Sequence, residues 1–177
     1  MTDDTTAHFQ QLARYNSWAN SRLYAAALDL PIETYRRPTR VFFQSLHGTL
    51  NHLLVADRIW LKRLTGQGPQ LNQLDEILYE DRAELTRARI AEDARMVAVV
   101  DGYDGFALAR SISYVMTTGE PQEQVLSNVL AHVFNHQTHH RGQAHACLSL
   151  LTDKEPPSLD LLLMMRGVPA PDLGSLV

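Results

Sequence analysis

The sequence has none of several features that would indicate a particular class of protein. It holds one cysteine, Cys147, so no disulfide can form within the chain. No run approaches the ~20 apolar residues that cross a bilayer, and residues 1–4 are acidic and polar, unlike a secretory signal. The formal net charge is −4 and the basic residues are scattered, so neither nucleic acid nor a membrane surface is an expected partner. A soluble, cytoplasmic protein is the expectation that remains.

The composition is that of an ordinary globular domain. Hydrophobic residues make up 45% of the 177 positions and charged residues 20%. A chain of this length buries roughly two-thirds or more of its surface in one core. We therefore expect a single domain spanning residues 1–177.

Four amphipathic segments with helical periodicity predict an all-α fold, most simply a four-helix bundle. Asp4, Thr5 or Thr6 is expected to cap the first helix, and Pro121 to lie in the first turn of the last. The four predicted helices cover residues 6–28, 41–64, 80–100 and 121–151.

Two shorter elements are expected outside these helices. Residues 107–119 are rich in β-branched types and partly alternate apolar with polar residues, which predicts a short extended or hairpin segment between the third and fourth helices. A short helix near residues 159–165 is expected after the break at residues 153–157.

Four of the eight histidines lie within nine consecutive positions of the last predicted helix. Because an α-helix advances ~100° per residue, His132, His136 and His140 share one face, one turn apart. The spacing of His136 and His140 is that of helical metal ligands. His139 points aside, and His145 is expected on the opposite, exposed side.

On their own, His136 and His140 are consistent with a metal site and equally with histidines that bind no metal. Histidine-rich helices can be solvated, and a histidine among apolar neighbours is commonly a hydrogen-bonded core residue. Two ligands are also too few, because a zinc site takes three or four protein groups. The metal interpretation therefore needs a ligand from another helix.

The second predicted helix offers His52 as that ligand. It lies at the edge of the apolar arc, where a buried imidazole costs free energy unless it is paired. His47 falls on the polar side and is expected at the surface. The expected triad is His52, His136 and His140, with His132 as the substitute if the register differs.

Three imidazoles leave at least one coordination position free, as in catalytic rather than structural zinc sites. Nitrogen ligands favour zinc, nickel, iron or cobalt over magnesium or calcium. Such a site acts as a Lewis acid, or lowers the pKa of a bound water or thiol.

Gln143 and Asn135 are candidates for orienting an imidazole, although bonds to neighbouring backbone explain them equally well. Cys147 lies roughly 10 Å along the helix from His140, too far to share a metal, and is expected to be a small core residue.

Asp57 and Arg141 fall on the apolar faces of their helices, where an unpaired charge is costly. We expect them to meet each other or polar groups of the first helix, and so to set the register of the two ligand helices.

Three segments together resemble the DinB/YfiT-like family over nearly the whole chain: YNSWANSRL at 15–23, LNHLLVADRIW at 50–60, and HVFNH followed by HHRGQ within 132–143. The resemblance implies an up-down-down-up four-helix bundle, often dimeric, with one metal at the positions of His52, His136 and His140. Relatives include thiol-dependent S-transferases and isomerases, in which the metal activates a low-molecular-weight thiol.

The leading hypothesis is a metal-dependent, transferase-like enzyme that uses one zinc or nickel ion and a small thiol, as a monomer or a homodimer. Tyr15, Trp18 and Asn20 are candidates for lining its pocket, although core packing is the commoner role of such aromatic residues. A metal-dependent hydrolase is disfavoured because the histidine segment holds no carboxylate. A non-catalytic metal-binding or stress-response bundle stays open as the alternative.

Overall fold

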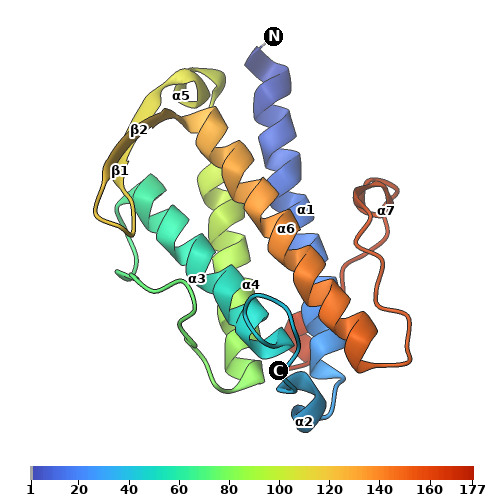
Figure 1. The fold of residues 1–177 in the computed structure, drawn as a ribbon. Helices are drawn as coiled ribbons and strands as arrows, with labels where there is room; N and C mark the ends of the chain where they lie inside the picture. The colour runs from blue at the N-terminus through green and yellow to red at the C-terminus, as the bar shows by residue number, and fades with distance from the viewer. Residues whose placement is uncertain (1) are drawn as a thin grey trace.

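Four long helices carry most of the buried side chains in the computed structural model, which describes residues 2–177 (Figure 1). Both α1 and α3 pack against α4 and α6. Figure 1 shows α1 and α6 running in one direction and α3 and α4 in the other. The chain is therefore mostly helical, as expected. The long helices are α1 (Thr2–Leu28), α3 (Leu46–Thr65), α4 (Arg82–Asp101) and α6 (Leu126–Leu151).

The shorter elements lie at the ends and along the side of the long helices. The predicted C-terminal helix is confirmed as α7 (Leu161–Met165). In residues 2–177, no helix combines the length and apolar character needed to cross a membrane. The remaining short helices are α2 (Ile32–Tyr35), α5 (Gly105–Ala109) and the 3₁₀ turn η1 (Leu173–Ser175).

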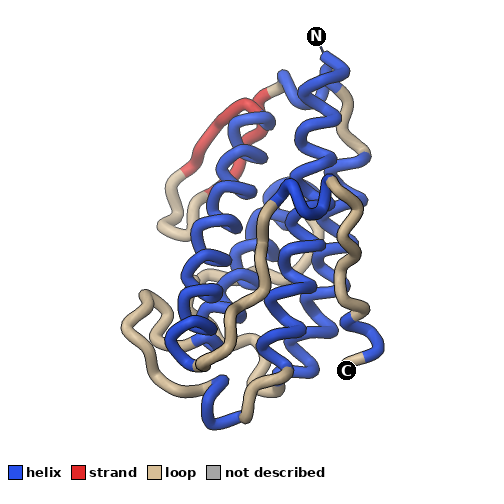
Figure 2. Tube along the Cα trace, turned by 90° about the vertical axis from the view of Figure 1, so that its right-hand side faces the viewer, coloured by secondary structure: helices blue, strands red, loops and turns tan. Residues whose placement is uncertain are grey.

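A two-stranded antiparallel sheet lies between α5 and α6; its first strand confirms the extended segment predicted there, and its second occupies residues predicted to be helical, so a small sheet is added to the expected all-α fold. Strand β1 (Ser111–Val115) pairs with β2 (Pro121–Val125), in a register that places Ser111 opposite Val125. Pro121 thus begins an edge strand, where a missing N–H is tolerated, and not a helix. Figure 2 shows this hairpin toward the same end of the helices as the N-terminus, with the C-terminus toward the other end.

Three predicted helix starts were wrong for local reasons. Helix α1 begins at Thr2, so the expected caps lie inside it. Helix α3 begins five residues later than predicted, because Gln44 adopts a left-handed φ of 66° and the Ser45 side chain accepts a hydrogen bond from Gly48 N. Helix α6 begins only after β2, at Leu126.

The core consists of two apolar clusters, toward opposite ends of the helices. One gathers around Leu23, Leu50 and Leu85, and the other around Met96 and Leu130. Each long helix contributes apolar side chains to both clusters, and buried polar residues lie between these two apolar segments. These residues are Asn16 and Asn20 of α1, Asp57 of α3, Arg89 and Asp93 of α4, and Gln137 and Arg141 of α6.

Arg89, which is fully buried, is the centre of this polar layer. Its Nη2 lies 2.8 Å from Asp57 Oδ2 and 3.0 Å from Asp93 Oδ1. Burial opposes the charge of Arg89, but the two carboxylates outweigh burial and raise its pKa. Asp57 also accepts a hydrogen bond from Gln137 of α6. The layer thereby joins α3, α4 and α6 at one level.

Arg141 extends the same layer to α1. It donates a hydrogen bond to Asn16, and Asn20 donates to Asp93 over 2.9 Å. The expectation that Arg141 meets polar groups of the first helix is confirmed. The alternative, a direct pair between Arg141 and Asp57, is wrong: Asp57 is neutralised by Arg89 of α4, which was not among the expected partners.

Replacing Arg89 with methionine should lower the free energy of unfolding by about 3–5 kcal/mol, because two buried carboxylates lose their counter-charge. Urea denaturation followed by circular dichroism measures this. The control is Arg14→Met, which breaks an exposed ion pair of 3.0 Å with Asp101 and should cost no more than about 1 kcal/mol. Equal losses in the two variants would contradict a central role for Arg89.

Candidate metal centre

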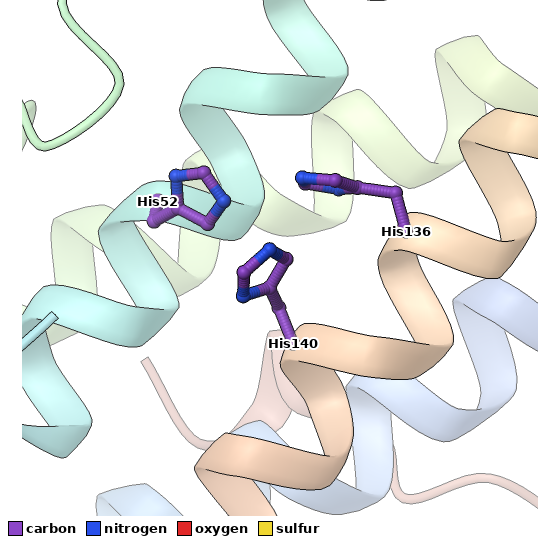
Figure 3. Close-up of side chains that lie close together, drawn as sticks. All are labelled: His52, His136 and His140. Carbon is purple, nitrogen blue, oxygen red and sulfur yellow. The ribbon is translucent and has the colours of Figure 1, made fainter. Parts of the chain in front are cut away.

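Three imidazoles meet between α3 and α6. His52 projects from α3, and His136 and His140 project from successive turns of α6 (Figure 3). One ring nitrogen from each lies within 4.8 Å of the other two. Nitrogens bound ~2.0–2.1 Å from a tetrahedral zinc ion stand about 3.4 Å apart, so the rings need to close by little more than about 1 Å. The three histidines expected from the sequence are brought together, in a geometry that can hold one metal ion.

His52 is held in the tautomer that a metal requires. Its Nδ1 lies 2.7 Å from the carbonyl oxygen of Leu74, which only accepts, so Nδ1 carries the proton. The other nitrogen, Nε2, is then a bare acceptor. It is buried and has no hydrogen-bond partner among the described residues. A buried acceptor without a partner is costly, and a bound cation would satisfy it.

Gln143 orients His140 in the same manner. Its Oε1 accepts a hydrogen bond of 2.9 Å from His140 Nδ1, and its amide nitrogen lies 3.1 Å from His139 Nε2. The orienting role considered for Gln143 is therefore confirmed, and His140 Nε2 is left free to bind a metal. Asn135, the other candidate, is exposed on α6.

The environment keeps these imidazoles neutral. Burial, and the neighbouring imidazoles after it, lower the pKa of His136 to about 3. Burial also lowers the pKa of His52 to about 4, and that of His140 to a lesser extent. At neutral pH all three rings are therefore uncharged, which is the form that binds metals.

Phe43 covers one side of the cluster, a contact that helical periodicity did not predict. Its ring stacks on His52 with centroids 3.7 Å apart, and its centroid lies 5.4 Å from that of His140 in an edge-on arrangement. Phe43 lies just before α3, where Gly48 permits a close approach: a Cβ on Gly48 would lie 2.2 Å from the Phe43 carbonyl oxygen. The sequence feature that could have indicated this contact is Ser45, which caps α3 and so places Phe43 in the loop before that helix.

A cleft of about 450 Å³ is lined by His136, one of the three clustered histidines, and by His132. One wall belongs to α3 and α6, and the other to the hairpin and Leu74. None of these lining residues, all within 2–177, is a carboxylic acid. The lining comprises Ala56, Ile59, Trp60, Arg63, Leu74, Tyr114, Met116, Thr117, Gln122, Gln124, His132 and His136.

Comparison with known proteins identifies the family of this chain. The model of the DinB family matches residues 1–170. The chain belongs to the DinB family. Protein DinB of Bacillus subtilis (strain 168) is 25% identical over 146 residues, which cover 78% of this chain and 83% of that relative. All three clustered histidines lie within the part that matches the DinB model.

The other histidines stand outside the cluster. His132 is exposed, with its ring 6.0 Å from that of His136, and His139 is exposed beside His140. The surface position expected for His47 is wrong: α2 packs on it, and its Nδ1 lies 3.0 Å from the Tyr35 hydroxyl. His145 is half-buried rather than exposed, with Nε2 3.0 Å from the Pro157 carbonyl oxygen.

The helix-one candidates for a pocket, Tyr15, Trp18 and Asn20, do not line the cleft that reaches His136. The Tyr15 hydroxyl donates to the Leu159 carbonyl oxygen over 2.6 Å, and Trp18 Nε1 donates to that of Val168 over 2.8 Å. These residues hold the C-terminal segment against α1, and Asn20 belongs to the polar layer.

Cys147 is buried in the apolar cluster that contains Leu50, with its sulfur 3.6 Å from Thr39 Oγ1. The prediction of a small core residue is confirmed.

Replacing Gly48 with alanine should force the Phe43 backbone away from α3 and lower the free energy of unfolding by about 1–3 kcal/mol. Gly142→Ala is the matched control, because Gly142 is helical with nothing within 4 Å of an added Cβ. Alanine there should stabilise by roughly 0.5–1 kcal/mol. Thermal and urea denaturation measure both, and a neutral Gly48→Ala would refute the close approach.

Proposed function

We propose that His52, His136 and His140 bind one divalent transition metal, zinc or nickel, and that the chain uses it in a thiol-dependent S-transfer. The observation that carries the proposal is the meeting of three neutral imidazole rings, one of which, His136, lines a cleft. Three protein ligands leave a coordination position for an exchangeable group, as catalytic zinc sites do. Bound there, the metal supplies a positive charge that lowers the pKa of a thiol.

The residues around the cluster have definite tasks in this proposal. Leu74 and Gln143 hold the His52 and His140 rings with Nε2 directed inward. Phe43 covers the cluster and excludes water from one side. Trp60 and Tyr114, whose ring centroids lie 5.3 Å apart, give the cleft an apolar wall for the carbon skeleton of a substrate.

The proposed transfer joins a small thiol to an electrophilic carbon. A carbon–sulfur bond forms, the bond from that carbon to its leaving group breaks, and the leaving group keeps the electron pair. The thiol proton passes to solvent. Hydrolysis is the weaker candidate, because the cleft lining contains no carboxylate to serve as a base.

Family membership and the directions of the long helices support the finer fold assignment, an up-down-down-up four-helix bundle in one domain over residues 1–177. We propose a small-molecule thiol as partner, with neither nucleic acid nor a membrane involved. A homodimer remains a prediction, to be tested by light scattering.

Protein purified without an affinity tag should contain about one equivalent of zinc or nickel per chain by elemental analysis. His52→Ala, His136→Ala and His140→Ala should each reduce this to below about 0.2 equivalents, since two imidazoles hold a metal weakly. A tag is avoided because column nickel could fill the site. His139→Ala is the control and should keep the metal; unchanged metal content in all the variants would refute the assignment.

The zinc-loaded protein should accelerate thioether formation between a small thiol and 1-chloro-2,4-dinitrobenzene, measured by absorbance over a panel of thiols. Lowering a thiol pKa toward 7 raises its thiolate fraction at neutral pH about tenfold or more, so an effect of that size over metal-free protein is expected. His136→Ala is the matched control. A protein that binds metal but gives no turnover with any thiol would instead be a non-catalytic metal-binding bundle.

A further inference from the structure

Arg63 of α3 is a half-buried cation at the junction of two cavities. It lines the cleft that reaches His136 and also a second cavity of about 210 Å³. The two cavities are adjacent, because they share Ile59, Tyr114, Met116 and Thr117 as well as Arg63. A ligand that extends from the histidine cluster along the cleft therefore reaches this guanidinium.

Two aromatic rings hold the Arg63 side chain in place. Its Cζ lies 4.5 Å from the ring centroid of Trp60 and 5.1 Å from that of Tyr114. Stacking of this kind fixes the plane of a guanidinium and leaves the N–H groups at its edge available as donors. The side chain is thus preorganised, and little conformational entropy is lost when a ligand binds it.

Arg63 lacks an acidic partner among residues 4–177, whose side chains the structure describes. No carboxylate of the described residues lies within ion-pair distance of it, and none lines either cavity. Burial lowers its pKa, because water is removed without a compensating negative charge. A positively charged group that is half-buried and unpaired favours an anion. Arginines with a carboxylate partner are Arg14, Arg36, Arg58, Arg89 and Arg95.

A row of aromatic rings links Arg63 to the histidine cluster. The Trp60 centroid lies 5.2 Å from that of His132, which lies 6.0 Å from that of His136. The cleft thus has metal-binding nitrogens toward one end, an apolar wall, and a cation at the other.

We propose that Arg63 binds an anionic group, a carboxylate or a phosphate, on the substrate that occupies this cleft. The substrate would have a reacting group at the histidines, an apolar middle and this anionic group at Arg63. The placement of the reacting group rests on the proposed function. The anion site itself depends only on Arg63 and its surroundings.

Arg63 also contacts the Tyr114 ring of the hairpin, so its structural role must be distinguished from anion binding. Loss of that contact would disturb the whole cleft and weaken neutral and anionic ligands alike. Loss of the Arg63 charge alone would weaken the binding of the anionic ligand and leave the binding of the neutral ligand unchanged. The test therefore compares two ligands of the same shape.

The ligands are two fluorescent dyes, anionic 1-anilinonaphthalene-8-sulfonate and neutral N-phenyl-1-naphthylamine, titrated into the full chain with and without zinc. Arg63→Gln should lower the affinity for the sulfonate dye about fivefold or more, and the affinity for the neutral dye less than about twofold. Arg63→Lys should keep part of the preference for the anion. Arg37→Gln, which removes the same charge from an exposed position before α3, should leave both dyes unchanged.

Displacement of the sulfonate dye by octanoate or by octyl phosphate then shows which anion Arg63 prefers. Unchanged sulfonate binding in Arg63→Gln, or equal loss of both dyes, would overturn the proposal. Because neither dye carries a thiol, this result is independent of the S-transfer assay. A protein without S-transfer activity could still bind the anion at Arg63, and a protein with that activity could lack the anion site.

Discussion

The buried charge of Arg89 governs how the long helices are aligned with one another. A guanidinium without access to water must be neutralised, and here Asp57 and Asp93 do so from two helices. Gln137 bonds to the same Asp57. Because Gln137 is next to His136 in α6, and Asp57 lies on α3 five residues after His52, the layer fixes the register of the two helices that carry the histidine cluster.

The histidine cluster is in turn preorganised by groups that do not touch a metal. A loop carbonyl from Leu74 and the amide of Gln143 select the tautomers of two rings. Burial keeps all three rings neutral, and Phe43 stacks on one of them. A loop, a helix and the segment before α3 therefore share in holding the site, and the hairpin adds one wall of the cleft.

Much of the fold and most of the cluster were predictable from the sequence. Helical periodicity located the four long helices, and the i,i+4 spacing of His136 and His140, with His52 on an apolar arc, selected the three residues that meet. The errors have a common origin. Pro121 fits a helix start as well as an edge strand, and only its pairing with β1 decides between them. Tyr15 and Trp18 resemble pocket residues until the C-terminal segment is seen packed on them.

The order of amino acids specifies which side chains share a helix face, because that follows from the 3.6-residue turn. It therefore determined the histidine pair, the apolar arcs and the presence of buried charges that need partners. The packing of helices and loops is needed to show that Arg89 of α4 neutralises Asp57 and that Phe43 covers His52. It is also needed to show that Arg63 lines a cleft that contains no acidic side chain. These outcomes depend on contacts between segments far apart in the chain, and local periodicity carries no information about distances across the core.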